Sequence, residues 1–192
     1  MARPREFDEN DVLDRALQIF WTRGYDATSI DDLVHATGLG RASLYGAFGD
    51  KESLFRRVVE RYAEQADAAN DELVARKTAR ESLEALFDVR LRGMCPKEGP
   101  SGCFLLQSGT SGTSAELVHA TLDRAAKHTR KTIAAILERG VMSGEVSRDA
   151  DIKALTDLLF VLLNGLATSA RAGMPPKALK AATNEAMRLT FA

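Results

Sequence analysis

Residues 28–48 read TSIDDLVHATGLGRASLYGAF and contain two short helical patterns with glycines between them. The opening hydroxyl residues, with an acid three positions on, predict a helix start, and Gly38 is expected to end that helix. In the second pattern Leu44 and Phe48 are four residues apart and share one apolar face. Two short helices joined by a tight turn are typical of a helix-turn-helix, whose second helix enters the major groove of DNA.

Helical patterns continue on both sides of this stretch. Apolar residues recur at helical spacing from Asp11 to Gly24, and Asp50 is placed to cap a long helix that runs toward Lys77. Further helices are predicted over residues 82–95, 102–107, 115–141, 151–172 and 176–191. No segment keeps the period-two alternation of a strand. The predicted fold is therefore all-α with about nine helices, divided into a small three-helix domain over residues 1–49 and a larger helical domain over residues 50–192.

The overall charge balance restricts how the chain can meet nucleic acid. The formal net charge is −1 and the pI is about 6.3, so the protein does not coat nucleic acid by bulk positive charge, and any DNA contact must come from a local patch. Glycine-rich phosphate loops, Ser-His-acid orderings and Cys-His zinc patterns do not stand out in the sequence. We therefore expect a protein that is not an enzyme and needs no cofactor.

The sequence also bears on the compartment. The longest nearly apolar stretch, residues 158–167, is interrupted by Asn164 and is about half the ~20 residues that cross a bilayer. The first eight residues hold two arginines and no apolar segment, unlike a secretory signal. The two cysteines, Cys95 and Cys103, are too few for a disulfide scaffold and are expected to be thiols. These features predict a cytoplasmic protein without a membrane span.

Residues 38–48 and 50–55 closely resemble the signature of the TetR family of transcriptional regulators, as do residues 16–20 and 24–30 upstream. The resemblance extends over residues 8–60, whereas the rest of the chain is similar only in length and helical content. It implies an N-terminal DNA-binding domain and a C-terminal ligand-binding and dimerisation domain. It also implies a homodimer on near-palindromic, double-stranded operator DNA, released by a small-molecule effector.

The second short helix carries the side chains expected to read DNA. Arg41, Ala42 and Ser43 lie at its start, where Arg suits the O6 and N7 atoms of guanine and Ser is permissive. Tyr45 offers a phenol to a phosphate or a ring to a thymine methyl, unless it is a half-buried packing residue. Lys51 opens the next helix, where free backbone amides favour an anion and where the family resemblance also implies a phosphate contact; a solvated lysine is the alternative.

Other DNA contacts are predicted around this core. Thr28 and Ser29 are candidates for a phosphate, although capping alone explains them. Arg3 and Arg5 form a short basic arm that reaches a flanking minor groove or is a tail. The sequence departs from the family pattern at Gly46 and Ala47, where a His or an aromatic residue commonly contacts the backbone, and also at Gly40, where Ser is common.

A ligand cavity is expected among the apolar stripes of the larger domain, although such stripes more often form core. Polar residues within them are the sharper signals, because a buried polar group needs a partner. The candidate effector contacts are Phe87, Leu91, Met94, Cys103, Phe104, Gln107, Leu122, Thr129, Phe160 and Asn164.

The last two helices are expected to form half of a dimeric four-helix bundle. Residues 157–167 are apolar on more than one face, and small residues nearby permit close approach. The residues predicted to face the partner are Leu158, Val161, Leu162, Gly165, Ser169, Ala182, Ala186 and Leu189.

Three alternatives remain open. Cys103 is either an oxidant or electrophile sensor, with Cys95 as its resolving partner, or an inert core thiol. The sequence from Glu116 to His119 has the Glu-x-x-His spacing of di-iron helix bundles, but such a site needs a second copy and two more carboxylates. A dimeric helical adaptor that has lost DNA binding would also explain the modest net charge.

Overall fold

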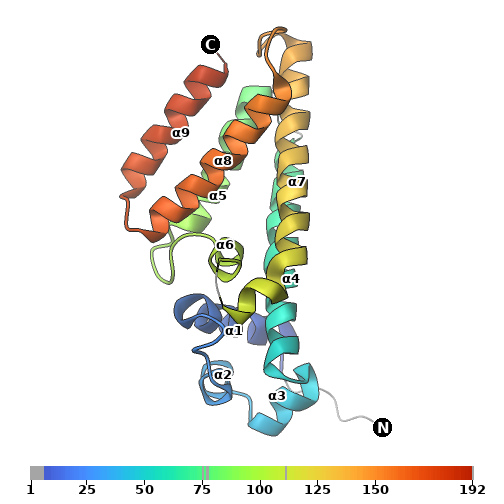
Figure 1. Ribbon diagram of the computed structural model, residues 1–192, viewed down its shortest axis with the longest axis vertical. Helices are drawn as coiled ribbons and strands as arrows, with labels where there is room; N and C mark the ends of the chain where they lie inside the picture. Colours follow the sequence, from blue (N-terminus) through green and yellow to red (C-terminus); the bar gives the residue numbers. More distant parts are fainter. Residues whose placement is uncertain (1–6, 75, 77, 111, 192) are drawn as a thin grey trace. The chain divides into compact units, whose positions relative to one another are not determined.

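The computed structural model describes residues 7–74, 76, 78–110 and 112–191, and within these it contains nine helices and no strand (Figure 1). The predicted all-α fold is confirmed. In chain order the helices are α1 Glu9–Arg23, α2 Ile30–Thr37, α3 Arg41–Phe48, α4 Lys51–Val74, α5 Ala79–Met94, α6 Phe104–Ser108, α7 Thr113–Ser143, α8 Ile152–Arg171 and α9 Pro176–Thr190.

The chain forms two compact units, and each unit is made of two separate stretches of the sequence. The first unit contains the described residues up to Glu64 together with α6 and the start of α7, to Leu122. The second contains residues 65–103 and 123–191, so that α4 and α7 contribute residues to both units. The predicted division between residues 49 and 50 stays a prediction.

Aromatic side chains fill the interior of the first unit. Phe20 of α1 meets Phe55 of α4 edge to face, with ring centroids 5.0 Å apart. Phe104 of α6 lies 5.9 Å from Trp21 and 5.6 Å from Tyr62 by the same measure. Edge-to-face and tilted ring pairs of this kind add to the apolar burial. The cluster packs α1, α4 and α6 around one core, which supports the helix-turn-helix.

The helix-turn-helix itself is set by local signals that the sequence contains. Ser29 caps α2, because its hydroxyl accepts a hydrogen bond from the Asp32 amide at 3.1 Å while the Asp32 carboxylate accepts from the Ser29 amide at 2.8 Å. Gly38 ends α2 in the left-handed conformation, with φ 74°. Leu44 and Phe48 are buried on one face of α3, as predicted. The remaining face of α3 is therefore exposed.

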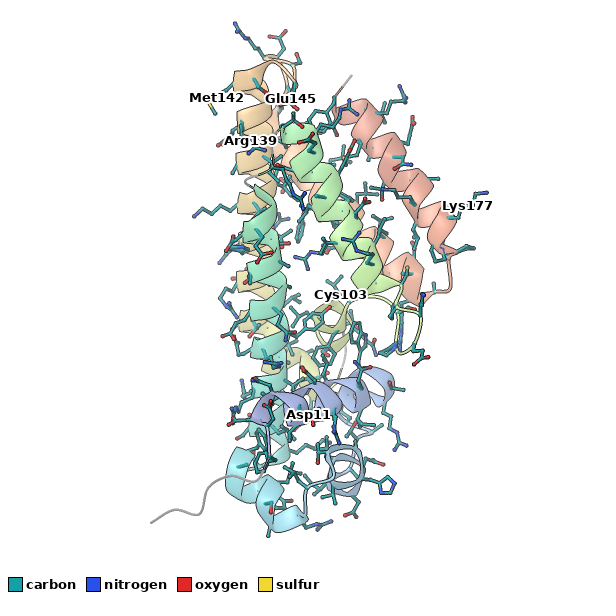
Figure 2. The ribbon with its side chains drawn as sticks, turned by 180° about the vertical axis from the view of Figure 1, so that it is seen from behind. Asp11, Cys103, Arg139, Met142, Glu145 and Lys177 are labelled. Atoms are coloured by element: carbon teal, nitrogen blue, oxygen red, sulfur yellow. The ribbon has the colours of Figure 1, made fainter. Side chains whose placement is uncertain are left out.

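In the second unit α5, α8 and α9 pack against one another, and α7 contributes three fully buried residues, Ile133, Ile136 and Leu137. The amide groups at the start of α5 are capped across the fold by Glu145, whose carboxylate accepts hydrogen bonds from Ala79 at 3.0 Å and Arg80 at 3.1 Å. Figure 2 shows Glu145 near Arg139 at the C-terminal end of α7. These backbone hydrogen bonds lower the pKa of Glu145.

Several predicted helix boundaries differ from those in the structure, most of all those of α5 and α7. Helix α5 begins at Ala79 rather than at residue 82, because Thr78 and Glu81 form a capping box. Helix α7 extends from Thr113 to Ser143, two residues beyond the predicted range of 115–141 at each end. At Gly140 a Cβ atom would lie 2.8 Å from the Val146 side chain, so this glycine permits close packing rather than ending the helix.

Among the described residues, α8 is the one helix long and apolar enough to cross a membrane when judged by length and composition alone. The core helix of a globular protein can pass the same test. Leu159, Leu163 and Leu166 of α8 are buried, and the helix packs against α5 and α9. Part of the apolar surface of α8 is therefore buried by packing within the second unit.

Candidate functional site

The exposed face of α3 carries the residues predicted to read DNA. Arg41, Ala42 and Ser43 are all exposed in its first turn, and Tyr45 follows on the next turn with 42% of its surface exposed. The open position of Tyr45 favours a contact role over the packing role. A Cβ atom at Gly46 would meet nothing within 4 Å, so the departure from the family pattern leaves open space on this face.

Arg41 is held by a carboxylate from the neighbouring helix. Its Nη2 donates a hydrogen bond to Oδ1 of Asp31 in α2 at 2.6 Å, and both side chains are largely exposed. The hydrogen bond to Asp31 raises the pKa of Arg41, whose guanidinium is a permanent cation with or without the pair. The role of Asp31 could not be predicted from the sequence, because its distance from Arg41 depends on the turn between α2 and α3.

Lys51 lies in the first turn of α4, and its Nζ stands 4.3 Å from the centre of the Tyr25 ring. Partial burial lowers the pKa of Lys51, while the nearby Asp26 opposes that shift. The contact with Tyr25 is a cation–π interaction and argues against a merely solvated lysine. At the start of α4 the Asp50 carboxylate already accepts a hydrogen bond from the Ser53 amide at 2.7 Å, so the predicted phosphate contact of Lys51 rests on its ammonium rather than on free amides.

The remaining residues predicted to contact DNA are not equally accessible. Thr28 is only 1% exposed and its hydroxyl donates to the Gly24 carbonyl at 2.6 Å, which favours the local role over the phosphate contact. Ser29 is exposed, but its hydroxyl takes part in the cap of α2. Arg3 and Arg5 lie outside the described residues.

An apolar surface runs along α8 and α9 in the second unit. Leu158 and Val161 of α8 and Leu189 of α9 are each more than 60% exposed. Around them Gly165 and Ala182 are exposed, whereas Leu162, Ser169 and Ala186 are half-buried. The two helices pack against each other, and we call these eight residues the α8–α9 face. Exposed apolar faces of this kind are typical of protein–protein interaction sites.

Two family models match the chain. "Bacterial regulatory proteins, tetR family" matches residues 12–58, and "Tetracyclin repressor-like, C-terminal domain" matches residues 79–186, which is more than half of the chain. The chain belongs to the TetR family. Both the resemblance drawn from residues 8–60 and the prediction of a DNA-binding regulator without enzymatic activity are thereby confirmed.

Relatives of this TetR-family protein include a transcriptional repressor and a regulator whose structure contains operator DNA. The HTH-type transcriptional repressor ComR of Escherichia coli K12 is 32% identical over 98% of this chain and 91% of its own length. A cysteine mutant of the TetR family transcriptional regulator CifR, complexed with 26 bp double-strand operator DNA, is 31% identical with a TM-score of 0.84, covering 97% of this chain and 98% of that one.

A third relative is similar over part of its length. The uncharacterised HTH-type transcriptional regulator YezE of Bacillus subtilis is 34% identical over 56% of this chain and 56% of its own length.

The ten predicted effector contacts of the TetR-family protein are divided between its units. Phe104, Gln107 and Leu122 belong to the first unit, and the other seven belong to the second. Gln107 donates from Nε2 to the Trp21 carbonyl at 3.0 Å. Thr129 is buried with its hydroxyl 3.5 Å from Arg90, and the ring of Phe160 lies under the Arg130 guanidinium at 4.2 Å. The side chains of Gln107, Thr129 and Phe160 therefore each have a contact within the protein.

Buried polar atoms without a partner are the sharper signal for a ligand. Within the described residues, the predicted contact Gln107 has one in its Oε1, and two further residues, both in the second unit, could not be predicted from the sequence. In the second unit Asn70 is 1% exposed and Thr156 is 6% exposed; among the described atoms, neither the Asn70 Nδ2 nor the Thr156 hydroxyl has a hydrogen-bond partner. A buried polar atom without a partner is costly, so a ligand or water is expected there. The burial of Asn70 could not be predicted, because the residue lies in the polar stretch of α4, whose composition is typical of a solvated helix.

The remaining alternatives concern thiols and metal. Cys95 and Cys103 are not joined in a disulfide, and burial raises the pKa of the Cys95 thiol, which makes it a weaker nucleophile. The choice between a sensing and an inert Cys103 stays open. Glu116 and His119 belong to no group of three or more metal-ligating side chains in the part of the chain that the structure describes.

Proposed function

We propose that this TetR-family regulator acts in the cytoplasm as a homodimeric repressor, and that each α3 inserts into the major groove of one half of a near-palindromic operator. The exposed first turn of α3 is the observation that carries the proposal. Arg41, Ala42 and Ser43 present side chains suited to base edges, while Leu44 and Phe48 anchor the helix from below. Tyr45 and Lys51 are proposed to bind the flanking phosphates.

The α8–α9 face supports the dimeric part of the proposal. Its exposed leucines and valine would be covered by the same face of a second copy, which gives a self-complementary, twofold interface. A twofold dimer places its recognition helices one or more duplex turns apart, at about 34 Å per turn, and so selects a palindromic site.

The effector is proposed to be a small molecule bound in the second unit. Asn70 and Thr156 support this, because their unpartnered polar atoms are buried there. Helix α4 begins with the proposed phosphate contact at Lys51 and reaches Asn70 in the other unit. A ligand that favours one arrangement of α4 by about 1–3 kcal/mol would produce useful release of DNA.

A selection from random duplexes tests the DNA-binding proposal. Purified protein is incubated with the library at low salt, bound DNA is recovered over several rounds, and wild type is compared with Tyr45→Ala and Lys51→Ala. We expect a palindromic site to be enriched by wild type and to be lost or weakened in the variants. If no salt-dependent duplex binding is found at all, the chain acts instead as a helical adaptor.

The enriched site then allows the effector to be sought. Candidate compounds are titrated against the complex, and a true inducer must bind the DNA-bound protein more weakly by the same factor by which it weakens operator binding. Asn70→Leu and Thr156→Val should reduce the effect of the compound without changing operator affinity in its absence. Release that is unchanged in both variants would place the effector elsewhere.

A further inference from the structure

We propose that Asp31 is a specificity-determining positioning residue, which directs Arg41 toward a base and away from the phosphates. The inference rests on the proposed role of α3 and adds to it a residue that does not belong to the recognition helix. It starts from the ion pair between Asp31 and Arg41, in which Nη2 lies 2.6 Å from Oδ1.

The ion pair does little for the stability of the fold. The side chain of Asp31 is 80% exposed and that of Arg41 is 58% exposed. Exposed pairs of this type contribute little to folding, because water screens them and both side chains lose freedom. The pair lies at the first turn of the recognition helix, so its orienting effect bears on DNA binding rather than on the core.

Helix α3 has no negative group of its own at this end. Its N-cap is Gly40, which makes no side-chain hydrogen bond, and its first turn contains no acid. The carboxylate that meets Arg41 is therefore supplied by α2. Since α2 is fixed at its start by the Ser29 and Asp32 capping box, Asp31 is held on an ordered turn.

The geometry leaves Arg41 able to read a base while it stays paired. The ion pair uses one of the two N–H groups of Nη2, so the guanidinium keeps one complete edge, either Nε with Nη2 or Nη1 with Nη2, whose two N–H donors are unused. Guanine presents two uncharged acceptors, O6 and N7, which can bind these donors beside a carboxylate. A phosphate is an anion and would be repelled by Asp31. The pair therefore favours base contact over backbone contact, and it reduces the number of arginine conformations that must be lost on binding.

Asp31→Asn removes the charge while keeping the size of the side chain, and Asp11→Asn is the matched control. Asp11 is also an exposed acid of the first unit paired with an arginine, Arg15, but both members of that pair lie on α1. Figure 2 labels Asp11 on this helix. The same selection is run on wild type, both Asn variants, Arg41→Ala, and the double variant of Asp31→Asn with Arg41→Ala.

The first measurement is the base preference at each position of the enriched site. The symmetric positions at which Arg41→Ala loses its preference are those that Arg41 reads. Asp31→Asn is expected to lower discrimination at these positions by about three- to tenfold, a part of what a good arginine–guanine pair provides, and to leave the other positions unchanged. It should add nothing in the Arg41→Ala background. Unchanged preference at the Arg41 positions, or an equal loss at all positions, overturns the proposal.

The second measurement is the affinity for a duplex of unrelated sequence as a function of salt, which requires no operator. When Arg41 is released from Asp31 it can bind a phosphate, so Asp31→Asn should raise this affinity about two- to fivefold at low salt and steepen its salt dependence by about one counterion. Asp11→Asn should do so much less. If wild type enriches no site, the proposed operator reading fails, but this measurement still decides the role of Asp31: equal gains in the two Asn variants overturn it.

Discussion

Replacing Val161 by Asp is expected to separate the dimer and thereby to abolish tight operator binding. Leu158, Val161 and Leu189 are 63%, 62% and 63% exposed in the single chain. Full burial of such a side chain is worth about 1.5–3 kcal/mol, so covering what remains exposed is worth about 1–2 kcal/mol for each. A twofold interface uses each side chain twice, which gives roughly 6–12 kcal/mol in favour of association.

This gain is opposed by about 4–15 kcal/mol for the freedom that two molecules lose on association, so the balance is sensitive to one residue. Val161→Asp removes two apolar contacts and brings a carboxylate from each copy into a surface that should exclude water, which costs several kcal/mol. We expect the Kd of the dimer to rise at least about a hundredfold, which is about 2.7 kcal/mol. Sedimentation at a series of protein concentrations measures this, and gel shift on the full operator and on one half-site measures its effect on DNA.

The control is Met142→Asp. Met142 is 79% exposed at the C-terminal end of α7, outside the α8–α9 face, and receives the same change of charge (Figure 2). It should leave the dimer unchanged. If Val161→Asp sediments as wild type does over the whole concentration series, the assignment of the α8–α9 face as the dimer interface is refuted.

Three further substitutions probe separate features. Glu145→Gln should lower the free energy of unfolding by about 1 kcal/mol at pH 7, because it weakens a charge-assisted cap of α5. Since the folded-state pKa of Glu145 is lowered, this difference should be constant above the ordinary Glu pKa and shrink as the pH falls below about 4; an equal difference at pH 3 contradicts the role of the charge. Ser29→Ala should lower the free energy of unfolding in urea by about 1 kcal/mol, because it removes the cap of α2. If the operator affinity of the variant also falls at a temperature at which it and the wild type are fully folded, Ser29 contacts a phosphate as well. Lys51→Ala should weaken binding to all duplexes alike and reduce the salt slope by about one counterion, whereas a loss confined to one base position contradicts phosphate binding.

The sequence was sufficient to predict features that depend on neighbours a few residues apart. The Ser29–Asp32 cap, the end of α2 at Gly38 and the buried pair of Leu44 and Phe48 all arise from contacts within one turn or one helix. The exposure of Arg41 to Ser43 follows from that burial, since the residues on the opposite face of a helix must point away. The candidate DNA-reading surface could therefore be predicted from the order of the residues alone.

Features that depend on tertiary packing could not be predicted in this way. Thr28 and Ser29 are adjacent hydroxyl residues, yet one is buried and the other exposed, and only the path of the turn after α1 decides which. Glu145 meets the amide of Ala79 across 66 residues of chain. Asn70 lies in a stretch with the composition of a solvated helix, and its burial follows from packing within the second unit. No local pattern contains that information.

The first compact unit includes α6 and the beginning of α7, and this sets the order in which the protein can mature on the ribosome. The rings of Trp21 and Tyr62 meet Phe104, which is synthesised after α5 and can pack against them only once it has itself left the exit tunnel. Until then the nascent recognition helix lacks part of the core beneath it. A chain that ends before Phe104 therefore lacks part of the core that supports the helix-turn-helix. Hybrid regulators made by exchanging only the first 49 residues would lose the ring contacts of Trp21 with Tyr62 and Phe104 unless the recipient supplies matching aromatic residues.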